Sequence, residues 1–197
     1  MLSRLLQFKI TLKDIKPEIW RRIIVPEKYS FWDLHVAIQD VMGWKDYHLH
    51  AFHIRKKHSQ TVLEIGIPDD ERFEDDPEIL KGWEVSIKEV FHDVGVEGEY
   101  EYDFGDSWIH RVLLEAIVLH EKGEKYPKCI GGARACPPED CGGIYGYQDL
   151  LSIISDPSCE EYASMMNWLG GSYDPEAFNC ESVKFDSPLK RWKIAFK

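Results

Sequence analysis

The feature that most constrains the fold is the stretch 100–115, in which aromatic, acidic and histidine side chains are concentrated. In its first half, aromatic residues alternate with acidic ones, at Tyr100, Tyr102 and Phe104. A period of two is typical of a half-buried strand. Gly105-Asp106 suits a tight turn, and the residues after it are largely apolar on both faces. The stretch therefore predicts a hairpin whose second strand lies in the centre of a sheet.

The segments before this hairpin predict two strands, a helix and a third strand. Residues 5–13 and 18–25 show alternating apolar side chains and predict an antiparallel pair. Ser30 is a predicted N-cap, apolar residues follow it at helical spacing, and Gly43 closes the helix. Residues 48–54 predict the next strand. The order strand–strand–helix–strand indicates an α+β fold with a mainly antiparallel sheet.

The other segments predict loops and C-terminal helices. Residues 56–82 hold little periodicity and a run of acidic residues, which indicates a long exposed loop or, alternatively, an acidic docking surface. Residues 121–143 are rich in Gly, Pro and Cys and indicate a structured loop. Helices are expected near residues 150–154 and 158–169, and we expect them to pack on the sheet. The tail Leu189–Phe196 alternates weakly and is expected to pack back on the domain.

Composition restricts the class of protein. The length of 197 residues suits one domain, residues 1–197. The net charge of −11 comes from 24 basic and 35 acidic residues, which disfavours non-specific binding to nucleic acid or anionic membranes. No apolar run is long enough to span a bilayer, and the start lacks the apolar centre of a signal peptide. With five cysteines and no secretion signal, we expect a cytoplasmic protein with reduced thiols.

Two histidines form the pattern His48-x-His50 on a predicted strand, so both imidazoles would share one face. Both could then reach one divalent metal ion, with a third ligand from His110, Asp103 or Asp106 if the hairpin pairs beside this strand. Such a site, with the three histidines as leading candidates, would have the open geometry of catalytic zinc. The alternative is that these histidines only form hydrogen bonds at a sheet edge.

Four carboxylates are candidates for acid–base chemistry: Asp103, Asp106, Glu139 and Asp140. The first two flank the hairpin turn close to His110, and a carboxylate beside a histidine can act as an acid or a base. The last two follow two prolines and precede two glycines, which indicates a rigid loop. The alternative is a purely structural role, in which all four carboxylates cap turns or accept hydrogen bonds from local amides.

Several segments together resemble one family, the plasmid pRiA4b open-reading-frame-three-like proteins, some of which carry the label of insertion-element passenger protein TnpR. The matching segments are Trp20–Pro26, Phe31–Gln39, Met42–Trp44, His48–Phe52, Tyr102–Trp108 with His110, Cys136–Asp140, Gly142-Gly143, Gly146-Tyr147 and Asp174–Phe178. The resemblance covers nearly the whole chain and implies an α+β domain without an agreed biochemical activity. The family motifs include the polar residues already named: His48, His50, Asp103, Asp106, His110, Glu139 and Asp140. Relatives often carry histidines where this chain has Ser158–Tyr162.

Three hypotheses follow for the function. The leading one is a protein that binds an unknown ligand or partner in a polar cleft near His48, His50, Asp103, Asp106 and His110, walled by Trp44, Tyr102 and Trp108. The second is a metal-dependent hydrolase that uses the same cleft, with Asp103 or Asp106 positioning or deprotonating water. The third is an accessory factor of mobile DNA that acts through protein contacts, since the net charge disfavours direct DNA binding.

Overall fold

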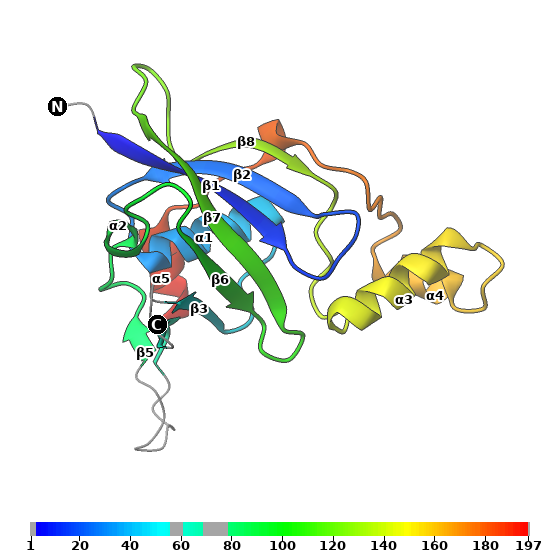
Figure 1. Cartoon of the computed structure of the whole chain (residues 1–197). Helices are drawn as coiled ribbons and strands as arrows, with labels where there is room; N and C mark the ends of the chain where they lie inside the picture. Colours follow the sequence, from blue (N-terminus) through cyan, green and yellow to red (C-terminus); the bar gives the residue numbers. More distant parts are fainter. Residues whose placement is uncertain (1–2, 56–60, 69–78, 197) are drawn as a thin grey trace.

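The computed structural model describes residues 3–55, 61–68 and 79–196. Within these residues, eight strands form one sheet in the order β5-β4-β3-β6-β7-β1-β2-β8 (Figure 1). Neighbouring strands are antiparallel except for β4 and β5, so the predicted α+β fold with a mainly antiparallel sheet is confirmed. The strands are β1 (Arg4–Leu12), β2 (Trp20–Pro26), β3 (His50–Arg55), β4 (Val62–Gly66), β5 (Ile79–Lys81), β6 (Glu97–Tyr102), β7 (Trp108–Leu119) and β8 (Lys128–Ala133).

The helices are α1 (Phe31–Met42), α2 (Ile87–Val90), α3 (Gly143–Ser155), α4 (Tyr162–Trp168) and α5 (Pro188–Ala195), with a 3-10 turn η1 (Cys180–Ser182). Helix α1 forms where the sequence predicts it. The side chain of Ser30 accepts from the amide of Asp33, the Asp33 carboxylate accepts from the amide of Ser30, and Gly43 ends the helix with a φ of 90°. Ten of its twelve residues are buried, so α1 packs along the sheet and closes the hydrophobic core (Figure 1).

The predicted central hairpin is confirmed. Strand β7 lies between β6 and β1, and its residues Trp108, His110 and Val112 are buried on one face. Tyr100 of β6 pairs with His110 and is equally buried. The period-two pattern identified this pair because a strand covered by a helix on one face must turn every second side chain into the core.

Three strands lie where the sequence predicted loops. Strands β4 and β5 occur inside the segment 56–82, although residues 69–78, which hold the acidic run, lie outside the described part of the chain. Strand β8 lies inside the segment 121–143 and pairs with β2 at one edge of the sheet. The sequence did not predict β8 because the strand contains two glycines, which weaken the strand signal but are tolerated at the edge of a sheet.

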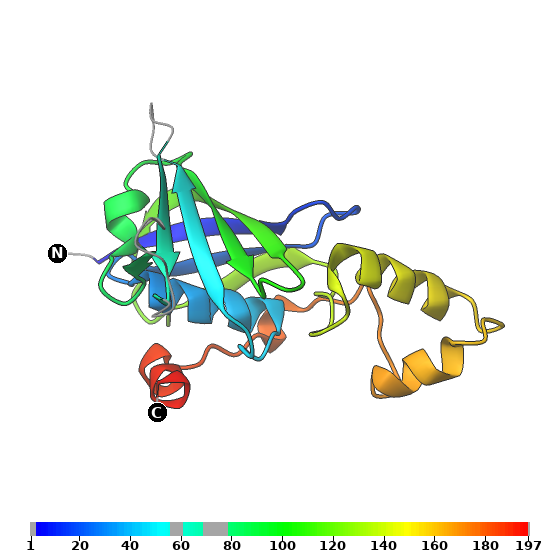
Figure 2. The same cartoon turned by 90° about the horizontal axis from the view of Figure 1, so that it is seen from below.

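The C-terminal helices pack on the rest of the chain to different extents. Helix α3 buries only Gly143, Tyr147 and Leu150, all in its first eight residues, and all seven residues of α4 are described without one being buried. Helices α3 and α4 therefore form an arm, residues 143–168, that projects beyond the sheet (Figure 2). The C-terminal tail, which alternates weakly in sequence, forms helix α5, and α5 contacts α1. None of the helices in the described segments has the length and apolarity needed to cross a bilayer.

Candidate functional site

Three loops converge at the end of the sheet where β6 stops and β3 begins. The first loop, residues 44–49, leads from α1 into β3. The second, residues 103–107, is the turn of the central hairpin. The third, residues 134–142, leads from β8 to α3. Most of the predicted cleft residues lie in these loops or directly beside them, at Trp44, His48, Tyr102, Asp103 and Asp106. The third loop also carries two of the predicted acid–base candidates, Glu139 and Asp140.

His48 is the centre of this convergence. Its Nε2 atom lies 2.9 Å from Oδ1 of Asp140 and 3.5 Å from Oδ2 of Asp103. The atom itself is buried and has no aligned hydrogen bond among the described residues, because neither carboxylate lies in line with an N–H on this nitrogen. His48 was predicted inside a strand, but β3 begins only at His50. The bend before β3 turns His48 toward the two carboxylates.

Asp103 is positioned by the backbone of the hairpin turn. Its own φ is +57°, a left-handed conformation that Asp tolerates better than most residues. One carboxylate oxygen, Oδ1, accepts from the amide of Gly105 at 3.0 Å. The other, Oδ2, faces His48. The amide of Asp103 donates to the carbonyl of Leu49 at 3.0 Å, which holds the first loop against the second.

Asp140 is positioned by contacts that fasten the third loop to the first. The indole Nε1 of Trp44 donates to the carbonyl of Pro137 at 2.9 Å. The carboxylate of Glu139 accepts from the amide of Lys45 at 2.7 Å and from the hydroxyl of Tyr102 at 3.2 Å. Burial raises the pKa of the Glu139 carboxyl. Glu139 therefore holds the loops together. The neighbouring Asp140 has a backbone φ of +56°, and its carboxylate faces His48.

Asp106 fastens the hairpin turn to the start of α3. Its Oδ2 atom accepts from the amide of Gly142 at 3.2 Å. Gly143 has a φ of +66°, and a Cβ atom at this position would lie 2.7 Å from the carbonyl oxygen of Asp106. Only glycine fits this approach without strain. Asp106 therefore has a structural contact of its own and is not in the group formed by His48, Asp103 and Asp140.

The group of His48, Asp103 and Asp140 has the chemistry of a cation site. One atom from each side chain lies within 4.8 Å of the other two. Ligands bound to one zinc ion at ~2.0–2.2 Å lie roughly 3.4 Å apart in a tetrahedral site. The distances of 2.9 and 3.5 Å from the imidazole nitrogen to the two carboxylates are close to this spacing. A set of one imidazole and two carboxylates suits Zn²⁺ or Mn²⁺.

The predicted trio of His48, His50 and His110 is not brought together. Among the described residues, no group of three ligand atoms contains two of these histidines. His110 is fully buried, its Nδ1 lies 3.2 Å from the carbonyl of Tyr100, and burial lowers the pKa of His110 to about 4. Its ring contacts Trp44, and Trp108 lies 6.1 Å from Trp44 between ring centroids. Both residues therefore lie in the core beside the Trp44 ring and do not line an open cleft.

His50 belongs to a second buried cluster that the sequence did not reveal. Its ring stacks on His35, with centroids 3.5 Å apart and planes 7° from parallel. His35 places Nδ1 2.8 Å from the Tyr100 hydroxyl and Nε2 2.9 Å from Asp46. Stacked imidazoles direct their in-plane lone pairs along parallel planes, so they cannot both bind one ion well. His35 was missed because a histidine on the apolar side of a predicted helix gives no distinct signal.

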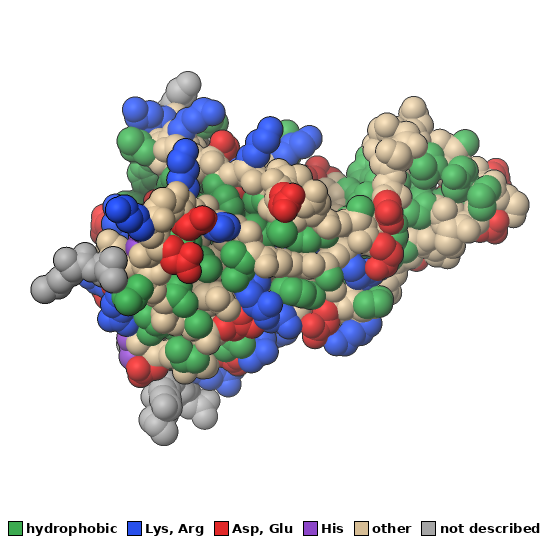
Figure 3. Space-filling model, turned by 90° about the horizontal axis from the view of Figure 1, so that it is seen from above, with side chains coloured by type: hydrophobic (Ala, Val, Ile, Leu, Met, Phe, Trp, Pro, Cys, Tyr) green, Lys and Arg blue, Asp and Glu red, His purple; other side chains and the backbone are tan. Residues whose placement is uncertain are grey.

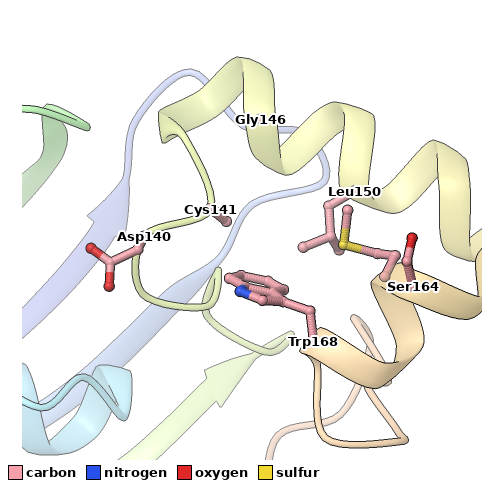
Figure 4. A pocket seen from close by; sticks show the side chains of 7 residues that line it. Asp140, Cys141, Gly146, Leu150, Ser164 and Trp168 are labelled. Atoms are coloured by element: carbon pink, nitrogen blue, oxygen red, sulfur yellow. The ribbon is translucent and has the colours of Figure 1, made fainter. Parts of the chain in front are cut away.

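A groove lies between the two helices of the arm (Figure 4). Its volume is about 360 Å³, and it is lined by Asp140, Cys141, Gly146, Leu150, Ser164, Met165 and Trp168. Burial raises the pKa of the Cys141 thiol to about 12, so this thiol is not activated as a nucleophile. In Figure 4 the Asp140 carboxylate points away from Leu150 and Trp168. Residue 140 therefore separates the groove from the group around His48.

Comparison with known proteins shows what the chain is similar to. It is 34% identical over 196 residues to the uncharacterized protein y4hQ of Sinorhizobium fredii, covering 98% of this chain and 96% of that protein. It is also similar to the crystal structure of MM3350 from Methanosarcina mazei, a protein of unknown function, with a TM-score of 0.83 and 39% identity. That match covers 94% of this chain and all of the other. The model of the plasmid pRiA4b ORF-3-like protein family matches residues 4–182, and the chain belongs to this family.

Proposed function

We propose that this protein binds its ligand through a divalent cation held by His48, Asp103 and Asp140. The observation that carries the proposal is the approach of three ligand atoms from three separate loops to within 4.8 Å of one another. The loops are fastened to each other by contacts of Trp44 and Glu139 that do not use the three candidate ligands. A site of this kind, with its supporting contacts on neighbouring residues, is preorganised for an ion.

The partial exposure of the group supports a ligand-binding role. The side chains of His48 and Asp140 are 30% and 64% exposed, whereas that of Asp103 is 11% exposed. Structural zinc sites are closed by four protein ligands, whereas sites that bind a further molecule keep a position open. A cation on three protein ligands here would face solvent on one side and could accept an oxygen or nitrogen atom of the ligand.

The test is the metal content of protein purified without chelator and reconstituted with Zn²⁺ or Mn²⁺, measured by mass spectrometry. We expect about one ion per chain in the wild type and a loss of most of it in His48→Ala, because one of three ligands is gone. His92→Ala is the matched control, since His92 is exposed and lies outside the group. A wild type that stays metal-free after reconstitution, or a His48→Ala variant that keeps its ion, would refute the proposal.

A second candidate function is metal-dependent hydrolysis, because the carboxyl of Glu139 is available as a base close to the proposed ion. A divalent cation on an open three-ligand site lowers the pKa of bound water. Burial raises the pKa of the Glu139 carboxyl, and Glu139 is next to the candidate ligand Asp140 in the sequence. In this version Glu139 takes the proton from water, a role that the sequence had suggested for Asp103 or Asp106. Hydrolysis of a panel of ester, amide and phosphoester substrates with added Mn²⁺ or Zn²⁺ would test it, with Glu139→Gln expected to keep the ion and lose turnover.

A further inference from the structure

The helical arm, residues 143–168, carries only negative charge. It contains Asp149, Asp156, Glu160 and Glu161, and no Lys, Arg or His. The same holds for the longer segment 135–183, which has nine acidic residues and no basic one. This segment therefore carries most of the chain's net charge of −11. Figure 3 shows acidic and hydrophobic side chains on the arm, which projects at the right of that view.

The arm also exposes large apolar side chains. Trp168 at the end of α4 is 51% exposed and lines the groove between α3 and α4 together with Leu150 and Met165. Tyr145 on α3 is 83% exposed. An apolar groove on an arm whose charges are all of one sign suits the binding of an apolar segment of the opposite charge.

Helix α5 has the complementary surface. It docks on the rest of the chain through Arg191 and Trp192, and the opposite side exposes Leu189, Lys190, Lys193 and Ile194. Leu189 with Lys193, and Lys190 with Ile194, are four residues apart, so the four side chains form one continuous stripe. The stripe combines two lysines with two aliphatic residues that are 64% and 63% exposed, and it contains no acidic residue.

The two surfaces cannot meet within one chain. Figures 1 and 2 both place α5 beside α1 and the arm beyond the far end of the sheet. We infer that the exposed stripe of α5 from one copy docks in the groove of the acidic arm of a second copy. A two-fold axis would make this contact twice, since each copy carries one stripe and one groove, and would give a closed dimer. The inference does not rest on the cation site: of the three candidate ligands only Asp140 lines the groove, and its carboxylate points away from Leu150 in Figure 4.

Analytical ultracentrifugation of the full chain at low and high salt tests the inference. We expect a dimer whose dissociation constant rises as salt is added, because the contact joins opposite charges. The α5 reversal, Lys190→Glu with Lys193→Glu, and the arm reversal, Glu160→Lys with Glu161→Lys, should each weaken self-association by about tenfold or more. All four side chains are exposed, so both variants should keep the circular dichroism spectrum of the wild type.

The decisive sample is an equal mixture of the two reversed proteins. Each variant alone opposes like charges in both contacts, whereas the mixed pair restores opposite charges in both contacts. We therefore expect the mixture to dimerise as the wild type does. The control Lys88→Glu with Lys122→Glu makes the same change in net charge as the α5 reversal, at exposed positions outside both surfaces, and should dimerise normally. A wild type that stays monomeric at high concentration and low salt, or a mixture that behaves like its separate components, would overturn the inference.

Discussion

The Nε2 atom of His48 lies 2.9 Å from Oδ1 of Asp140, although the two residues flank the whole central hairpin in the sequence. The first follows α1 and the second precedes α3, and the hairpin turn brings Asp103 to the same place. One imidazole therefore meets two carboxylates at a point where hydrogen bonds from other residues hold the chain. It is the relationship on which the proposed cation site depends.

The first prediction concerns Asp140. The substitution Asp140→Asn should lower the affinity for Zn²⁺ or Mn²⁺ by at least about tenfold, because it removes the charge of one ligand. The measurement is the increase in melting temperature on adding the ion, since an ion that binds only the folded state stabilises it. Asp149→Asn, an exposed carboxylate on α3, is the control and should retain the wild-type increase. Equal increases in both variants would exclude Asp140 as a ligand.

The second prediction concerns the approach of α3 to the hairpin turn. Gly143→Ala should destabilise the protein by about 2–3 kcal/mol in urea unfolding. Alanine disfavours the positive φ of this position, and its Cβ would lie 2.7 Å from the carbonyl oxygen of Asp106. Gly123→Ala has a positive φ but open space around the new atom, and it should cost only about 1 kcal/mol. The difference between the two measures the close approach. Equal costs would mean that α3 moves aside freely.

The third prediction concerns acid stability. Burial lowers the pKa of His110 from 6.5 to about 4, so the unfolded chain takes up a proton at a pH where the folded chain does not. The neutral, buried His110 therefore contributes fully to the free energy of unfolding above pH 6.5. This contribution falls by roughly 3 kcal/mol as the pH is lowered from 6.5 toward 4. His110→Gln should flatten the slope of unfolding free energy against pH between 6.5 and 4. Part of the slope should remain, since the pKa of buried His50 is lowered as well. An unchanged slope would contradict the assignment.

The fourth prediction concerns the docking of α5. Arg191 donates to Asp40 at 2.8 Å and to Asp186 at 2.9 Å, and Trp192 packs edge-on against Trp32. Arg191→Gln should therefore loosen α5 while the sheet stays folded. Amide hydrogen exchange in α5 should accelerate by about tenfold or more, with little change in β7. Lys184→Gln changes an exposed residue that precedes α5 and lies outside its exposed stripe, and it should leave exchange unchanged. Equal acceleration across the whole chain would indicate global unfolding instead.

The local patterns predicted much of the fold because they reflect interactions close in sequence. The capping box of Ser30 and Asp33 and the C-cap Gly43 appear where the residues indicate them. The alternation at Tyr100 and Tyr102 identified β6. The same reasoning missed β4, β5 and β8, because glycine and short length weaken the periodic signal. It also placed the start of the second C-terminal helix at residue 158, whereas α4 begins after Glu161 and the hydroxyl of Ser158 donates to Asp156 instead.

The sequence alone determined the α+β class, the family resemblance and a set of candidate polar residues. It could not determine which of those residues meet. A period-two count placed His48 and His50 on one face, but β3 begins after His48, so the two imidazoles point to different neighbours. The left-handed backbone of Asp103 and Asp140 and the loop contacts of Glu139 decide which atoms meet at His48. These depend on contacts between distant segments, which exist only once the sheet and α1 have packed, and no local pattern encodes them.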